Sequence, residues 1–156
     1  MLNLNERAPN FKLRDKNGDI HELNKINSEY FIIYFYPKDD TSGCTIESKE
    51  FSENLDKFEE LNAKVIGISG GDEESKKKFI EKHNLKILLL SDPYFEVCKK
   101  YEVYGWKNFA GNKFLGINRT TYILENKRVI KVFEKVKAEG HSEEVLEFIQ
   151  SFHSNK

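Results

Sequence analysis

Short apolar runs along the chain alternate with longer amphipathic stretches. The runs predict strands at 11–15 paired with 19–23, at Tyr30–Tyr36, Lys64–Ser69 and Lys86–Leu90, and at Thr120–Glu125 paired with Val129–Phe133. Each pair is a predicted hairpin, the first over Lys16-Asn17-Gly18 and the second over Asn126-Lys127. The central runs are continuous rather than alternating, as expected for strands that are covered on both faces.

The stretches between the strands have the spacing of helices. Predicted helices cover a stretch after Cys44 with apolar residues at 51, 55, 58 and 61, then Asp72–His83, a short segment from Asp92-Pro93 to about Tyr101, and a last helix from near Ser142. In the short helix the aspartate is the expected N-cap and the proline suits the first turn. The charged residues 72–78 are interpreted as a solvated helix face with charge pairs at i,i+3 and i,i+4.

This order of elements predicts an α/β fold. A β-α-β-α-β sequence gives the sheet a parallel component, because parallel neighbours need a crossover connection. We expect a three-layer α/β/α sandwich with a mixed sheet and an N-terminal β-hairpin at one edge, of which the thioredoxin-like fold is the commonest small version. No Pro/Gly-rich linker or repeat interrupts the chain, and 156 residues suffice for one core, so residues 1–156 are expected to form one domain.

Composition and charge narrow the classes of partner. The chain is 38% apolar and 33% charged with a net charge of −1, so no strong electrostatic preference favours nucleic acid or an anionic membrane. The longest apolar runs are too short to span a bilayer, and the N-terminus lacks the pattern of a secretory signal. We therefore expect a soluble, cytoplasmic protein that is a monomer or a weak homodimer.

The cysteines and histidines do not have the spacing of a disulfide framework or a metal site. Cys44 and Cys98 are the only cysteines and lie 54 positions apart. The four histidines, His21, His83, His141 and His153, show no ligand spacing either. We expect a reducing compartment, no metal and no cofactor, which leaves the presence of a lone thiol at Cys44 to be explained.

Cys44 follows a polar loop at the expected start of a helix. There the unpaired backbone N–H groups and the positive end of the helix dipole favour a thiolate, so the cysteine is positioned to be a nucleophile. Thr41, three residues earlier, has a hydroxyl that can donate to and accept from a substrate oxygen beside the sulfur. Pro37 closes the preceding strand with a rigid ring without an N–H, which can cover the site without competing for hydrogen bonds.

A guanidinium suits the stabilisation of an oxyanion leaving group, because it stays charged and offers several donors. Arg7 and Arg128 lie at positions typical of a surface, whereas Arg119 stands at the entry of the strand Thr120–Glu125. Taken singly, a cysteine is more often a small buried apolar residue, and an arginine more often forms a surface ion pair. The combination of Arg119 with the Cys44 loop favours a catalytic site.

These residues resemble a known family. The pattern Pro37-x-x-x-Thr41-x-x-Cys44 with a downstream arginine resembles the active-site motif of the peroxiredoxins. The segments "FYPKDDTSGCTIES", "ISGGDEESKKKF", "LLSDPYFEVCKKYEVYG" and "GINRTTYIL" are similar to the bacterioferritin comigratory protein, or peroxiredoxin Q, branch. The likeness extends from "APNFKLRD" to the last helix, in the order of the family.

The resemblance implies a thioredoxin-dependent peroxidase with antioxidant activity on a thioredoxin-like fold. Cys44 would be the peroxidatic cysteine, which attacks the O–O bond of hydrogen peroxide or an organic hydroperoxide and becomes a sulfenic acid. Thr41 and Arg119 would hold the peroxide oxygens, and Pro37 would limit access to the sulfenate. Glu47 matches a position where the branch usually has Glu or Gln and is expected to have a supporting role at most.

The chain departs from the branch in two places. Lys49 stands where many members have a resolving cysteine, and Ser42 stands where they commonly have proline. Cys98 is the remaining candidate for resolution, but Tyr94 and Tyr101 share its predicted helix face, which indicates core packing. We therefore expect a one-cysteine enzyme whose sulfenic acid is reduced by an external thiol such as thioredoxin, with a two-cysteine route through Cys98 as the alternative.

Two other hypotheses for the function of the chain remain open. A thiol–disulfide oxidoreductase on the same fold usually has C-x-x-C, and Glu47 in place of the second cysteine counts against it. A non-catalytic binding module would keep Cys44 for packing. The aromatic segment Tyr104–Gly116 is expected to be a packed connector, with an apolar wall over the thiolate or a dimer contact as its alternatives.

Overall fold

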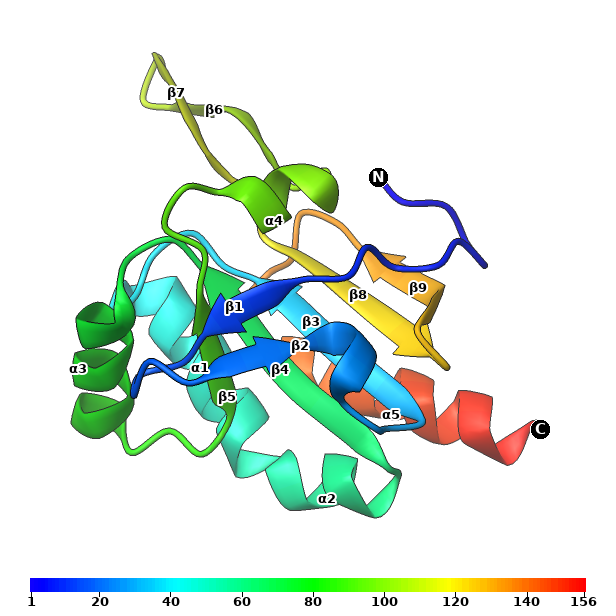
Figure 1. The fold of residues 1–156 in the computed structure, drawn as a ribbon. Coiled ribbons are helices and arrows are strands. Elements are labelled where there is room, and N and C mark those ends of the chain that lie inside the picture. The colour runs from blue at the N-terminus through cyan, green and yellow to red at the C-terminus, as the bar shows by residue number, and fades with distance from the viewer.

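A seven-stranded mixed sheet forms the centre of the computed structural model, which describes residues 1–156 (Figure 1). Its strands, in the order β2-β1-β5-β4-β3-β8-β9, are β1 (Lys12–Arg14), β2 (Ile20–Glu22), β3 (Tyr30–Phe35), β4 (Ala63–Ser69), β5 (Leu88–Ser91), β8 (Thr120–Glu125) and β9 (Arg128–Phe133). Strands β3, β4 and β5 are parallel, while β1 and β8 run antiparallel to β5 and β3. The predicted mixed sheet with an N-terminal edge hairpin is confirmed.

Both faces of the sheet are covered, which gives the predicted three-layer arrangement. The helices are α1 (Ser42–Glu53), α2 (Leu55–Glu60), α3 (Glu73–His83), α4 (Glu96–Lys100) and α5 (His141–Ser154), with a short 3₁₀ turn η1 at Leu23–Lys25. On one face, Tyr30, Ile32 and Tyr34 of β3 pack with apolar residues of α1, α2, α3 and α5. On the other, the alternate residues of β3 pack with α4 and the N-terminal segment. The fold is thioredoxin-like.

Helix boundaries differ from the prediction where tertiary contacts intervene. The helix after Cys44 is interrupted at Asn54, whose side-chain amide donates to Ser142 Oγ at 2.9 Å and so joins α1 to α5. The fourth helix begins at Glu96 rather than near Pro93, because Phe95 adopts a left-handed backbone with φ of 59°. Its ring stacks on Tyr104, with centroids 4.6 Å apart. This packing overrides the local helix signal.

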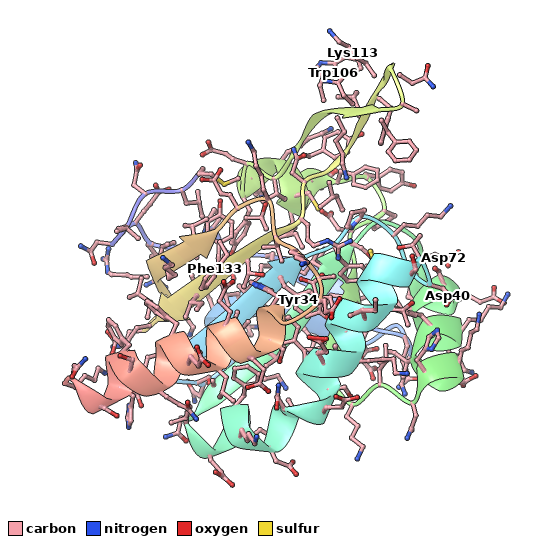
Figure 2. The ribbon with its side chains drawn as sticks, turned by 180° about the vertical axis from the view of Figure 1, so that it is seen from behind. Tyr34, Asp40, Asp72, Trp106, Lys113 and Phe133 are labelled. Carbon is pink, nitrogen blue, oxygen red and sulfur yellow. The ribbon has the colours of Figure 1, made fainter.

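A separate two-stranded hairpin of β6 (Tyr104–Phe109) and β7 (Asn112–Ile117) projects from one end of the molecule (Figures 1 and 2). The expectation of a packed connector is wrong, since Trp106 is 70% and Phe109 76% exposed. Ala110 and Gly111 both have positive φ and form the two-residue turn. A ribbon of two strands has no second layer of its own, so Trp106, Phe109 and Phe114 stay exposed to solvent.

The carboxyl ends of the parallel strands meet at the end of the sheet from which this hairpin projects. The loop after β3 leads there into α1, and Phe35 at the end of β3 pairs with Thr120 at the start of β8. In open α/β sheets, ligands bind outside these strand ends. None of the helices combines the length and the apolar character needed to cross a bilayer.

Candidate active site

Cys44 lies in the first turn of α1 and is fully buried. Thr41 is the N-cap, with extended backbone angles of −88° and 157°, and its carbonyl accepts the N–H of Thr45 at 2.8 Å. The N–H groups of Gly43 and Cys44 precede this first helical bond and have no acceptor within the protein. The sulfur therefore sits at the positive end of the α1 dipole, beside donors that remain free for a ligand.

Arg119 lies directly before β8, the strand that pairs with β3, and from there it reaches the sulfur of Cys44. Its Nη2 donates to Cys44 Sγ at 3.4 Å, and its side chain is 17% exposed. The approach depends on Gly43, because a Cβ at that position would lie 3.1 Å from Nη2. The antiparallel pairing of β8 with β3 thus brings together two residues that are far apart in the sequence.

Glu47 lies one helical turn after Cys44 and holds the guanidinium. Arg119 Nη1 donates to Glu47 Oε1 at 2.6 Å, while Oε2 is buried without a partner. Burial raises the pKa of Glu47 to about 7, with the charge of Arg119 acting in the opposite direction. Burial also works to lower the pKa of Arg119, but Glu47 and Cys44 outweigh it and the pKa is raised. Cys44, Glu47 and Arg119 form one contiguous polar cluster.

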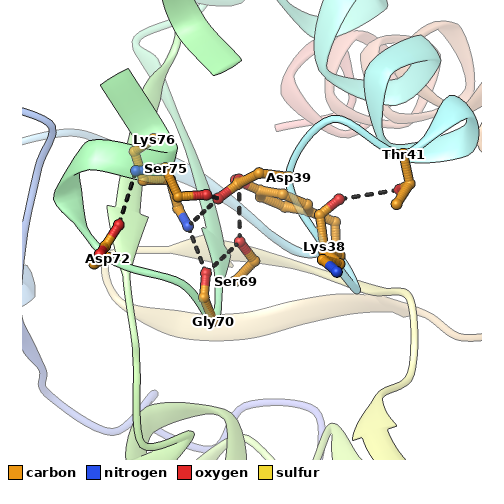
Figure 3. A network of polar contacts seen from close by, with 9 residues as sticks. Lys38, Asp39, Thr41, Ser69, Gly70, Asp72, Ser75 and Lys76 are labelled. Carbon is orange, nitrogen blue, oxygen red and sulfur yellow. Dashed lines mark hydrogen bonds and ion pairs between the residues drawn. The ribbon is translucent and has the colours of Figure 1, made fainter. Parts of the chain in front are cut away.

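Pro37 and Thr41 flank this cluster without contacting it through hydrogen bonds. Pro37 is half-buried directly after β3. Thr41 is exposed, and its hydroxyl donates to the Lys38 carbonyl at 3.0 Å (Figure 3). The Thr41 oxygen keeps its acceptor capacity toward solvent, on the same helical turn as the sulfur.

Lys107 of the hairpin is a further cation near the cluster that the sequence did not single out. Its Nζ donates to the carbonyl of Ile117, two residues before Arg119, at 2.8 Å. Burial lowers the pKa of Lys107, the charge of Arg119 lowers it further, and Cys44 acts in the opposite direction. The exposed ring of Phe114 lies 6.0 Å from Nζ. The hairpin therefore presents a cation and an aromatic ring toward this side of the site.

Asp39 and Lys76 form a second buried group that sequence reasoning missed (Figure 3). Lys76 belongs to the run 72–78, whose charge pattern predicts a solvated helix face, but its side chain is 0% exposed. The available signal was the acidic pair Asp39-Asp40 inside the Cys44 loop. No three His, Cys, Asp or Glu side chains are arranged to hold a metal ion.

Cys98 lies on the opposite face of the sheet from Cys44. It packs in the core with Val97 and Tyr101, whereas Tyr94 is 77% exposed, so the expected packing of Tyr94 against it is wrong. Burial and the carboxylate of Asp92 raise the pKa of the Cys98 thiol. The sheet separates the two core clusters that contain the cysteines.

Comparisons with known proteins agree with this geometry. The model of the AhpC/TSA family matches residues 4–133. A putative peroxiredoxin bcp of Helicobacter pylori is 40% identical over 147 residues, which cover 94% of this chain and 97% of that protein. Peroxiredoxin Bcp of Bacillus subtilis is 35% identical over 150 residues, or 96% of each chain.

Solved structures of related sequence also superimpose on this chain. The bacterioferritin comigratory protein of Xanthomonas campestris, described for its alkyl peroxide reduction activity, superimposes with a TM-score of 0.85 at 32% identity over 91% of each chain. A variant of PrxQ from Xylella fastidiosa gives a TM-score of 0.91 at 29% identity over 98% of each chain. On the family match and these near full-length relatives, the chain belongs to the AhpC/TSA family, among the Bcp/PrxQ peroxiredoxins.

Proposed function

We propose that this chain is a thiol-dependent peroxidase that reduces hydrogen peroxide and organic hydroperoxides through a sulfenic acid on Cys44. The observation that carries the proposal is the Arg119 guanidinium 3.4 Å from a buried cysteine sulfur at the start of a helix. Homologues of this fold and sequence are named peroxiredoxins. All the groups involved belong to residues 1–156, which we propose act as one domain.

The chemistry follows from the charges around the sulfur. The Cys44 thiolate attacks one peroxide oxygen, the S–O bond forms as the O–O bond breaks, and the second oxygen leaves as an alkoxide or hydroxide that takes a proton from solvent. Arg119 and the free N–H groups of the first α1 turn stabilise the charge that develops on the oxygens. Thr41 orients the peroxide through its hydroxyl, and Pro37 limits access to the product sulfenate.

Reduction of the sulfenic acid is assigned to an external thiol such as thioredoxin. A disulfide requires Cα atoms within about 7 Å, and the two cysteines lie on opposite faces of the sheet. Lys49 is exposed on α1 and offers no thiol. A one-cysteine cycle fits this arrangement better than a bond to Cys98, and it needs the thiol supply of a reducing compartment such as the cytoplasm.

Alkyl hydroperoxides are the substrates that the hairpin favours. Phe114 lies on the strand face that also carries Lys107, and Lys107 reaches the carbonyl of Ile117 next to the Arg119 segment. An apolar substituent on the peroxide would contact the Phe114 ring there, whereas hydrogen peroxide has no such substituent. The relative from Xanthomonas campestris is described as reducing alkyl peroxides.

The test is peroxide consumption in the presence of thioredoxin and its reductase. Wild-type protein is expected to turn over, and Cys44→Ser is expected to abolish turnover, with Cys98→Ser as the matched control. Unchanged turnover in Cys44→Ser contradicts the proposal. Mass spectrometry after one equivalent of peroxide should find a sulfenic acid on Cys44, and a Cys44 that alkylates only above about pH 8 would instead favour a non-catalytic module.

A further inference from the structure

We propose that Asp39 is a positioning residue for the reaction of Cys44 with peroxide, and that it acts through its buried ion pair with Lys76. The inference rests on the proposed peroxidase function. It assigns a role to a group that touches neither the sulfur nor its arginine. Asp39 lies in the loop between β3 and α1, so anything that fixes its side chain also fixes the path of the chain toward Thr41 and Cys44.

The carboxylate of Asp39 joins three elements (Figure 3). Its Oδ1 accepts from Tyr36 Oη at 2.6 Å and from Ser69 Oγ, at the end of β4, at 3.4 Å. Its Oδ2 accepts from Ser75 Oγ at 2.6 Å and from Lys76 Nζ at 2.9 Å, both in α3. One side chain of the loop is therefore tied at once to the neighbouring strand and to the next helix.

Lys76 completes the arrangement from inside the protein. Its ammonium also donates to the Gly70 carbonyl at 2.6 Å, which ties the turn after β4 to the same point. Burial lowers the pKa of Lys76, with Asp39 acting in the opposite direction, and the Asp39 side chain is only 5% exposed. A buried ion pair is a poor source of stability, since apolar residues of similar size often serve as well or better. The hydrogen bonds of the pair are directional, so unlike apolar packing they hold the loop in one geometry.

The chain between Asp39 and the sulfur transmits that geometry. Asp40 has a left-handed φ of 60°, which is strained for a non-glycine residue, and is held on α3 by Lys82 at 2.8 Å and His83 at 2.7 Å. Figure 2 shows Asp40 beside α3. Thr41 then donates from its hydroxyl to the Lys38 carbonyl and occupies the N-cap position of α1. A shift of the Asp39 anchor therefore moves the Thr41 hydroxyl relative to the sulfur.

The test compares two reactions of the same cysteine. Oxidation by hydrogen peroxide needs the oxygens to be held, whereas alkylation by iodoacetamide needs only a reactive sulfur and a local opening that admits the reagent to the buried Cys44. Both second-order rate constants are measured by rapid quenching and mass spectrometry of the Cys44 peptide, in wild-type protein and in Lys76→Met. Lys78→Met is the matched control, because it makes the same change two residues along α3 at an ion pair whose side chains are more than 70% exposed.

We expect Lys76→Met to lower the ratio of the peroxide rate constant to the alkylation rate constant by about tenfold or more through a slower reaction with peroxide, since misplacement by about 1 Å can cost 10²-fold. Lys78→Met should leave the ratio unchanged. Ser75→Ala removes one bond to Asp39 without leaving a charge unpaired, so it should lower the ratio less and keeps the test usable if Lys76→Met does not fold. A peroxide rate constant that is unchanged in the folded variants overturns the inference, whatever happens to the alkylation rate constant or the melting temperature. Wild-type protein that does not react with peroxide contradicts the proposed function instead.

Discussion

Replacing Glu47 by Gln removes a carboxyl group whose ionisation is coupled to folding. The side chain is fully buried, with Oε1 on Arg119 at 2.6 Å and Oε2 unpartnered. Burial raises the pKa of Glu47 to about 7 in the folded protein, against an ordinary value of 4.5. Between these two values the folded state holds a proton that the unfolded chain has released.

The sign and size of the effect follow from this difference. The contribution of Glu47 to stability is complete below pH 4.5 and is lost as the pH rises through 7, because the unfolded state binds fewer protons in that window. Between pH 5 and pH 8 the loss amounts to about 2 to 3 kcal/mol, at about 1.36 kcal/mol for each unit of pKa difference. Gln has no proton to release, so Glu47→Gln should lack this loss.

The measurement is urea unfolding of wild type and Glu47→Gln at pH 5 and pH 8. The free energy of unfolding of wild type, relative to the variant, should fall by about 2 to 3 kcal/mol across this range. Glu53→Gln makes the same chemical change at an exposed position of α1 and controls for the mutation itself. A relative stability that is constant, or that rises with pH, refutes the reasoning, since it means that pairing with Arg119 balances or outweighs burial.

Three further predictions concern the reaction itself. Gly43→Ala places a Cβ 3.1 Å from Arg119 Nη2 and should slow oxidation of Cys44 by peroxide about tenfold in rapid-quench experiments; an unchanged rate would show that the guanidinium moves freely. Arg119→Lys keeps the charge but loses the fork that contacts both Glu47 and Cys44, so the same rate should fall about 10²-fold, and full activity would contradict the role given to the fork. Cys98→Ser should sustain turnover with an external thiol in a peroxide-consumption assay. A Cys44–Cys98 bond in a non-reducing peptide map of the monomer would refute the one-cysteine cycle.

The sequence predicted secondary structure best where neighbouring residues alone determine it. The continuous apolar run at Tyr30–Phe35 predicts a central strand, and both faces of that strand are buried. Lys16-Asn17-Gly18 predicts a hairpin turn, and Gly18 has the positive φ that such a turn requires. The helix start at Ser42 follows from the polar loop, and it places Cys44 among unpaired N–H groups.

Predictions failed where a distant contact competes with the local pattern. Phe95 stacks on Tyr104 and delays the fourth helix, and the Asn54 amide interrupts the first one. The hairpin 104–117 contains enough aromatic residues to predict burial, but no further strand or helix covers it. Lys76 lies in a run of charges that is typical of an exposed face, and only the position of Asp39 explains its burial.

The sequence by itself determined the strand and helix order, the place of Cys44 at a helix start and the likeness to the peroxiredoxins, because these depend on neighbours within a few turns of chain. Tertiary structure decided which side chains meet. The pairing of β8 with β3 brings Arg119 to Cys44, the alternation of β3 puts the two cysteines on opposite faces, and the packing of α3 buries the Asp39–Lys76 pair. Such contacts join residues tens of positions apart, so no local period or spacing encodes them.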